Sequence, residues 1–131
     1  MAVQTQGFRP EGAGDDGTSV VQQTLRREVN ERIRQLVAAG GPAEETLDAM
    51  CECVAYSCTA HVELTIGDYE TVRRFPTRFL VKEGHVVSES ERVVAEADGY
   101  VVVEKLGRGG LYAVRADPRR RSAASADRDT A

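Results

Sequence analysis

Apolar residues between positions 18 and 41 recur every three or four positions, which is the spacing of one face of an α-helix. Charged residues, mostly arginine and glutamate, occupy the other side. Thr18 or Ser19 can cap the first turn, and Gly40-Gly41-Pro42 ends the helical pattern. We therefore predict an amphipathic helix over 18–41, whose apolar face consists of Val21, Leu25, Val29, Ile33 and Leu36.

Residues 42–54 fit two patterns, and the choice matters for the cysteines among them. Pro42, two early glutamates and apolar residues at helical spacing favour a helix. On an extended backbone, in contrast, Cys51 and Cys53 would point to the same face, whereas on a helix they would diverge by about 200°. A site that uses both sulfurs therefore requires any helix here to end near Met50.

Beyond the cysteines, the alternation of apolar and polar residues favours β-structure. Thr65, with a carboxylate three residues later, is expected to cap a short helix that must stop before Pro76. Asp98-Gly99 predicts a hairpin turn, and residues 106–115 are expected to form a last turn or an edge strand. The strands themselves are predicted at 61–65, 79–81, 92–95 and 100–105.

Together these elements predict an α+β fold, in which an N-terminal amphipathic helix is followed by a small antiparallel sheet with one inserted helix. Both ends of the chain are too poor in apolar residues to offset the entropy lost on ordering. We predict a disordered segment 1–17, the helix 18–41, a small α+β domain 42–115 and a disordered tail 116–131. A folded part of about 90 residues has a marginal core, so a bound metal would add useful stability.

Composition limits the expected cellular location of the protein and the classes of partner that it can bind. No apolar run approaches the roughly 20 residues of a membrane span, and the N-terminus lacks the apolar segment of a signal peptide, so we expect a cytoplasmic protein without membrane contact. The formal net charge of −4 argues against a phosphate-backbone partner. A nucleic-acid-associated regulatory adaptor is kept as an alternative, although Glu28 and Glu31 interrupt the basic side of the helix. Its basic residues are Arg26, Arg27, Arg32 and Arg34, with Arg119, Arg120 and Arg121 near the C-terminus.

Three cysteines, Cys51, Cys53 and Cys58, are the most distinctive chemical feature. An odd, closely spaced set in a reducing compartment favours a metal or thiol site over a disulfide framework. Three thiolates and one imidazole fill the tetrahedral shell of a structural zinc ion and leave no position for substrate. His61 needs only a local turn to join them, whereas His85 would tie two halves of the domain together, and the spacing leaves both open. The alternatives are reduced cysteines buried as small apolar residues, or a thiol redox sensor.

Six segments of this chain form a recognisable set. They are REVNERI at 27–33, the Cys51-x-Cys53-x4-Cys58 cluster, VELT at 62–65 with the following Tyr69, Arg73, Pro76 and Phe79, Gly84-His85, ERVV at 91–94 and VVEK at 102–105. The set resembles a family of small actinobacterial proteins, over roughly residues 25–106. In that family the histidine after glycine recurs, whereas another residue usually stands at the position of His61. The resemblance thus implies Cys51, Cys53, Cys58 and His85 as the ligands of one structural zinc ion per chain.

The chain departs from this family between Gly40 and Met50, where its linker is longer and where Met50 replaces the aromatic residue that often precedes the cysteines. The resemblance therefore does not define the residue at which the first strand begins. The resemblance implies a metal site and brings no activity with it.

The sequence contains no serine, histidine and carboxylate grouping, no phosphate-binding loop and no HExxH motif. We therefore expect a non-catalytic zinc-binding module that mediates protein–protein interaction, or self-association through the helix 18–41. Apolar stripes of this kind more often pack on their own domain. The alternative is an enzyme, either a metal-dependent hydrolase or a thiol oxidoreductase, with Glu52, Glu63 or Asp68 as acid or base. Charged residues beside a strand are more often solvated.

Overall fold

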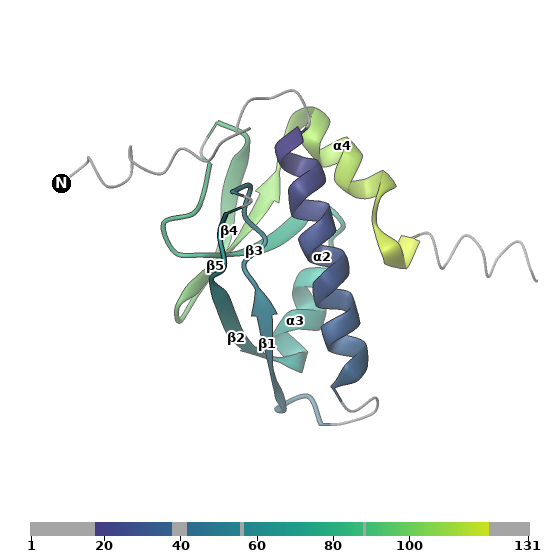
Figure 1. Ribbon diagram of the computed structural model, residues 1–131, viewed down its shortest axis with the longest axis vertical. Helices are drawn as coiled ribbons and strands as arrows, with labels where there is room; N and C mark the ends of the chain where they lie inside the picture. The colour runs from purple at the N-terminus through teal and green to yellow at the C-terminus, as the bar shows by residue number, and fades with distance from the viewer. Residues whose placement is uncertain (1–17, 38–41, 56, 88, 121–131) are drawn as a thin grey trace, which may run out of the picture.

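The computed structural model describes residues 18–37, 42–55, 57–87 and 89–120, and shows one long helix beside two antiparallel sheets (Figure 1). The elements in chain order are α2 (Thr18–Leu36), β1 (Thr46–Met50), β2 (His61–Thr65), α3 (Ile66–Arg73), β3 (Arg78–Lys82), β4 (Glu91–Ala97), β5 (Tyr100–Lys105) and α4 (Gly107–Arg115). The predicted α+β class is confirmed, with the strands divided between a β1-β2 sheet and a sheet in the order β3-β5-β4. The predicted disordered segment 1–17 and the predicted helix end at 38–41 lie outside the described residues.

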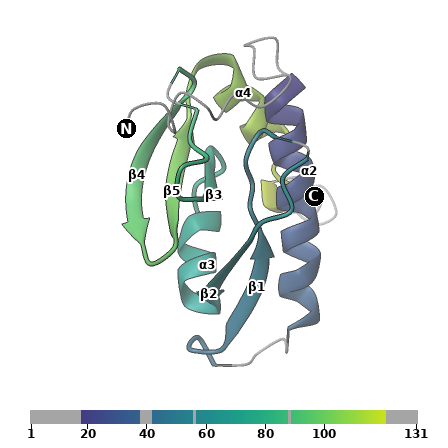
Figure 2. The same ribbon diagram turned by 60° about the vertical axis from the view of Figure 1, so that its left-hand side comes forward.

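Figure 2 shows the order of the layers across the molecule. The three-stranded sheet lies at one side, β1, β2 and α3 lie in the middle, and α2 runs along the opposite edge with α4 beside its N-terminal half. One side of α2 therefore faces the domain and its other side faces outward.

β1 settles the ambiguity over residues 42–54 in favour of an extended backbone. Its buried residues alternate with exposed ones, and they pair across the sheet with apolar residues of β2, Leu47 with Leu64 and Ala49 with Val62. Pro42 belongs to a turn, in which its carbonyl accepts a hydrogen bond from Glu45 N at 3.0 Å. Residues 46–50 are thus buried with the period of two that a strand imposes, and the helical alternative is wrong for them.

The local signals in the second half predict the structure well. Thr65 Oγ1 accepts a hydrogen bond from Asp68 N at 3.0 Å, as expected for the cap of α3, and α3 ends before Pro76. Gly99 adopts a φ of 84° between β4 and β5, which is the conformation that the Asp98-Gly99 turn requires. The predicted hairpin is therefore confirmed.

Residues 106–115 differ from the prediction, because most of them form a helix, α4, and not an edge strand. β5 is already paired on both sides, with β3 and with β4, so it has no free edge for another strand. The chain turns away at Gly107, where φ is 61°, and passes close to the end of β5. A Cβ atom at Gly110 would lie 2.7 Å from the carbonyl oxygen of Lys105, so this close approach requires glycine.

The predicted disordered tail begins too early, because charged side chains of residues 116–120 bind the helices of the domain. Arg119 forms ion pairs with Glu31 of α2 at 2.7 Å and with Glu70 of α3 at 2.8 Å, and Asp117 is buried. These contacts use charged groups, which a search for apolar residues to bury does not detect. The rest of the predicted tail, 121–131, lies outside the described residues.

The long helix α2 packs on the domain through its polar side. Its fully buried positions include Gln23, Arg27 and Asn30, whereas Val21, Leu25, Val29 and Leu36 of the predicted apolar face are exposed. Ile33 alone of that face is half-buried against the core. The expectation that the apolar stripe packs on its own domain is therefore wrong, because polar side chains of α2 bind main-chain groups of the domain instead.

β3 and β5 are buried on both faces and so divide the core into two clusters. Leu80 and Val102 face the cluster formed with β1, β2 and α3. Phe79, Val81, Val101 and Val103 face the second cluster, which also contains Cys51 and Cys53. Two of the three cysteines therefore lie at the centre of an apolar cluster, next to the N-terminal half of α2.

Candidate metal centre

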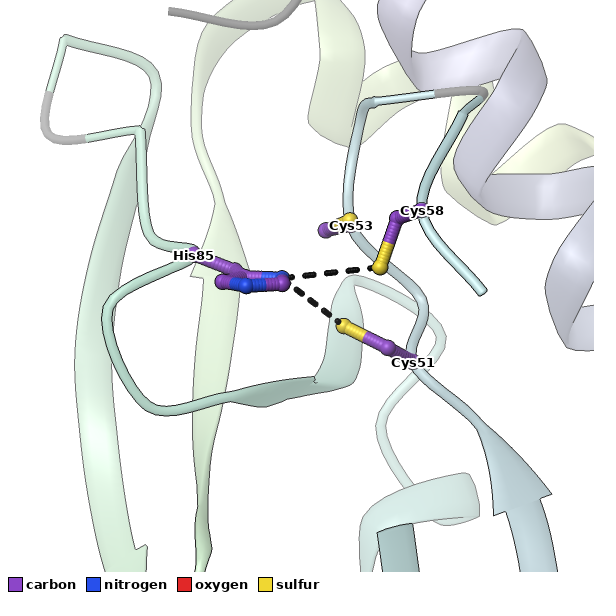
Figure 3. A group of neighbouring side chains, drawn as sticks. All are labelled: Cys51, Cys53, Cys58 and His85. Atoms are coloured by element: carbon purple, nitrogen blue, oxygen red, sulfur yellow. Dashed lines mark hydrogen bonds between the residues drawn. The ribbon is translucent and has the colours of Figure 1, made fainter. Parts of the chain in front are cut away.

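Two loops bring the predicted site residues together. Cys51, Cys53 and Cys58 lie in the loop between β1 and β2, and His85 lies after the turn that follows β3 (Figure 3). Their ligand atoms all lie within 4.8 Å of one another. Nδ1 of His85 lies 3.5 Å from Sγ of Cys51 and 3.6 Å from Sγ of Cys58. This arrangement joins an element of one sheet to an element of the other and can hold a metal ion.

The local backbone explains why the sulfurs converge. Cys51 N donates to Ala60 O at 3.0 Å and Glu52 N donates to Leu80 O at 2.8 Å, so the chain after β1 stays extended. On such a backbone, residues two apart share a face, which places both sulfurs on one side and the Glu52 carboxylate on the other. Gly84, with a φ of 86°, forms the turn that returns His85 toward them.

His61 lies elsewhere. It is exposed on β2, opposite Met50 of β1, and its Nδ1 lies 3.1 Å from Oδ2 of Asp48. The cluster found among the described residues contains His85 and not His61. The spacing in the sequence could not decide which histidine is the fourth candidate ligand. The turn at Gly84, which brings His85 toward the sulfurs, makes this choice in the structure.

The surroundings of the sulfurs favour the thiolate at Cys53 and the thiol at Cys51. Lys82 N donates to Sγ of Cys51 at 3.1 Å, and Ala60 N donates to Sγ of Cys58 at 3.4 Å. A hydrogen bond from Cys51 lowers the pKa of Cys53 to about 5, and this contact, together with burial, raises the pKa of Cys51. Amide donors that point at sulfur stabilise thiolates, which are the form that binds metals.

Glu52 stands between the two buried cysteines and is itself fully buried. Its carboxylate accepts hydrogen bonds from both terminal nitrogens of Arg73 at 2.8 and 2.9 Å, from Asn30 Nδ2 at 2.7 Å and from Leu80 N at 3.0 Å. The expectation that this residue is solvated is wrong, since the carboxylate holds a charge pair inside the fold. Glu63 and Asp68, the other candidate acids, are exposed and are not part of the cysteine cluster.

Side chains of α2 bind the main chain of the cysteine loop. Arg26 donates to Cys51 O at 3.1 Å and to Ala55 O at 2.7 Å. Asn30 donates to Met50 O at 2.9 Å and accepts from Met50 N at 2.7 Å. These bonds satisfy polar main-chain groups at the end of β1 and in the loop that follows it. The position of α2 and the conformation of the cysteine loop therefore depend on each other.

Sequence reasoning missed this polar side of α2, although a signal for it exists. Gln23, Arg26, Arg27, Asn30 and Arg34 recur at three- or four-residue spacing, as a buried face does. Arg27 donates to Pro76 O and to Ala113 O at 2.7 and 2.8 Å, so this face also binds α4. The regular spacing of long polar side chains on one face was the sequence signal that this face is buried.

No family model matches the chain, and no curated protein or solved structure was found to match it. The resemblance to small actinobacterial proteins therefore stays a prediction. In the part of the chain that the structure describes, no helix combines the length and the apolar character needed to cross a membrane.

Proposed function

We propose that this protein is a non-catalytic zinc-binding module that acts by binding protein in the cytoplasm, with one structural zinc ion per chain. The ligands would be Cys51, Cys53, Cys58 and His85. The proposal rests chiefly on the distances between the ligand atoms of these residues. A tetrahedral zinc ion with bonds of about 2.3 Å to sulfur and about 2.0–2.1 Å to nitrogen separates these two atoms by about 3.6 Å. The separations of 3.5 and 3.6 Å from His85 Nδ1 to two sulfurs fit this geometry.

A structural role fits better than a catalytic one. Three sulfurs and one nitrogen fill four coordination positions, whereas a catalytic zinc ion keeps one position for water or substrate. The buried carboxylate nearest in sequence, Glu52, is fully engaged by four donors and has no capacity left to act as a base. An ion held here would instead link the two sheets, since Cys51 follows β1 and His85 follows β3.

The outward side of α2 supports binding to protein. Leu25, Val29 and Leu36 are exposed, although the helix has a buried side of its own. An apolar helix face that the fold does not use is typical of an interaction surface. Nucleic acid is a poorer partner, because Arg26 and Arg27 are buried and donate to main-chain carbonyls.

Native mass spectrometry of freshly purified protein, with and without a strong chelator, tests the proposal. We expect one zinc ion per chain, and a shift to the higher charge states of an expanded chain after chelation. A chain that carries no metal and is nevertheless compact would contradict the proposal. The variant Glu63→Gln, which changes an exposed carboxylate outside the cluster, is the control for preparation effects.

A thiol redox site is the second candidate function. It is favoured by the contact between Cys51 and Cys53 and by the low pKa of Cys53, about 5, which keeps that thiol ionised at neutral pH. Mild oxidation followed by mass measurement separates the two proposals. A metal-free chain that loses two hydrogen atoms reversibly would favour the redox site, whereas zinc-loaded protein should resist this oxidation.

A further inference from the structure

We infer that Arg26 is a positioning residue of the metal centre, which holds the backbone around Cys53 and supplies the positive charge that balances the centre. This inference rests on the proposed function, because it names a residue that supports the same metal ion without binding it. Arg26 belongs to α2, whereas all four proposed ligands lie in loops that follow β1 and β3. The helix and the metal site are thereby connected through one side chain.

The guanidinium of Arg26 spans the backbone on both sides of Cys53. Its nitrogen Nη1 donates to the carbonyl of Cys51, two residues before Cys53, at 3.1 Å. Its nitrogen Nη2 donates to the carbonyl of Ala55, two residues after Cys53, at 2.7 Å. Residues 51–55 belong to neither a helix nor a strand, so their conformation depends on bonds of this kind. The rigid fork of an arginine can hold two carbonyls at once, and it thereby orients Cys53.

The same guanidinium lies beside a sulfur. Nη1 of Arg26 is 4.0 Å from Sγ of Cys53, and the contact is buried. This separation is long for a hydrogen bond, so the contact acts through charge. Among the hydrogen bonds of the described residues, no other brings an arginine or lysine side chain to a cysteine sulfur. The remaining donors to sulfur are main-chain amides and the ring of His85.

Charge balance gives this contact its role. A divalent zinc ion with three thiolates and a neutral imidazole has one net negative charge. Cys51 and Cys53 are fully buried in an apolar cluster, where an uncompensated charge is strongly unfavourable. Arg26 is itself only 4% exposed. Among the described residues its hydrogen bonds end on carbonyls and a sulfur, and none ends on a carboxylate. The metal centre and Arg26 therefore neutralise each other.

Arg27, the next residue of α2, is the matched control. It is buried as deeply as Arg26 and also donates to two carbonyls, those of Pro76 and Ala113. Neither carbonyl belongs to the cysteine loop, and no hydrogen bond of the described residues joins Arg27 to a sulfur. Loss of either arginine should therefore destabilise the fold, whereas only the loss of Arg26 should alter the metal site.

Zinc competition between the full chain and a coloured chelator tests the positioning role. Arg26→Gln should lower zinc affinity about 10–100-fold, as is typical of residues that hold metal ligands in place. Metal binding is linked to folding, so a general loss of stability also weakens it. Arg27→Gln measures that general effect. The loss in Arg26→Gln should be larger, and an equal loss in both variants would overturn the inference.

Cobalt(II) in place of zinc tests the charge role. A positive charge beside a sulfur stabilises its electrons, so charge transfer from sulfur to cobalt requires more energy. The charge-transfer bands of cobalt-loaded Arg26→Gln should therefore move to longer wavelength, whereas those of Arg27→Gln should stay close to wild type. The bands are read from loaded, folded protein, so a change of stability does not move them. Unshifted bands in Arg26→Gln would overturn the inference.

Arg26→Lys separates the two roles and serves if Arg26→Gln does not fold. Lysine keeps the charge but lacks the fork that spans two carbonyls. We expect bands close to those of wild type, with a zinc affinity below that of wild type. An Arg26→Lys variant with full zinc affinity would contradict the positioning role.

The wild-type samples separate this inference from the proposed function. Wild-type protein that binds neither zinc nor cobalt contradicts the proposed metal site itself. Wild-type protein that binds zinc, while Arg26→Gln behaves like Arg27→Gln in affinity and in spectrum, contradicts only the role of Arg26.

Discussion

Arg73 binds both carboxylate oxygens of Glu52 at 2.8 and 2.9 Å, and both side chains are buried. The carboxylate raises the pKa of Arg73, although burial alone would lower it. The pair connects α3 to the cysteine loop, because Glu52 stands between Cys51 and Cys53. An arginine held at this depth depends on its partner, since an unpaired buried charge is strongly unfavourable.

Glu52→Gln should therefore destabilise the fold by about 3–5 kcal/mol, since it leaves the Arg73 charge buried without its counterion. Urea denaturation in the presence of excess zinc measures this loss separately from metal affinity. The control is Glu63→Gln, which removes an exposed carboxylate of β2 and should change the free energy of unfolding by less than about 0.5 kcal/mol. If Glu52→Gln unfolds at the same urea concentration as wild type, the pair does not have this role.

His85→Ala should reduce zinc affinity more than about 100-fold and lower the melting temperature, because a ligand is lost and metal binding is linked to folding. His61→Ala is the matched control, since His61 is exposed and contacts only Asp48 among the interactions described for it. Competition with a coloured zinc chelator measures the affinity. The opposite order of effects would assign the fourth ligand to His61.

Zinc affinity should fall as the pH is lowered, and it should fall more steeply below about pH 5. The pKa of Cys53 is lowered to about 5 by its hydrogen bond with Cys51, so above this pH Cys53 is a thiolate that binds metal without losing a proton. Below this pH the metal must displace a proton from Cys53 as well. Chelator competition at a series of pH values checks the change of slope, and a slope that stays constant across pH 5 would contradict the assignment.

Arg119→Ala should destabilise the protein by about 1 kcal/mol at neutral pH, because it removes a cation shared by Glu31 and Glu70. Burial opposes ionisation of Glu31, but Arg119 lowers the pKa of both carboxyl groups. A lowered pKa means that this stability is present above the ordinary carboxyl range near pH 4 and is lost as the pH falls through the folded-state pKa.

The difference in unfolding free energy between wild type and Arg119→Ala should thus disappear in acid, which denaturation at several pH values can measure. Arg120→Ala is the control, because the neighbouring Arg120 is exposed. A difference that persists in acid would show that Arg119 acts through packing and not through charge.

The sequence predicts those parts of the fold that depend on neighbouring residues. Thr65 caps α3 through a residue three positions away, and Gly99 forms its turn through its own backbone freedom. Whether residues 106–115 form a strand or a helix could not be predicted this way, because one edge of β5 pairs with its hairpin neighbour β4 and the other with β3, which lies before β4 in the sequence. The pattern of neighbouring residues predicts whether a segment is a helix or a strand. Which edges of a sheet remain free for a further strand depends on the order of all its strands.

The candidate site shows the same division. The spacing of the cysteines is local and marks the cluster directly. His85 is 27 residues from Cys58, and it reaches the sulfurs only because the two sheets lie together. The orientation of α2 was missed because burial was expected for apolar residues. Arg26 is instead buried by bonds to carbonyls of the cysteine loop 25 and 29 residues away, and Asn30 by bonds to both main-chain groups of Met50, 20 residues away.

The contacts of α2 also bear on the order in which the chain folds. α2 precedes every strand in the described chain, yet Arg27 binds the carbonyl of Ala113, 86 residues later, and Glu31 binds Arg119, 88 residues later. Such distant contacts close large loops and form late. During synthesis, α2 leaves the ribosome before the other described elements, and the carbonyls at positions 50–55 that Arg26 and Asn30 bind follow soon afterwards. The carbonyl of Ala113 and the guanidinium of Arg119 follow only when nearly the whole domain has been made. The earliest of the described elements is therefore expected to be among the last to complete its contacts.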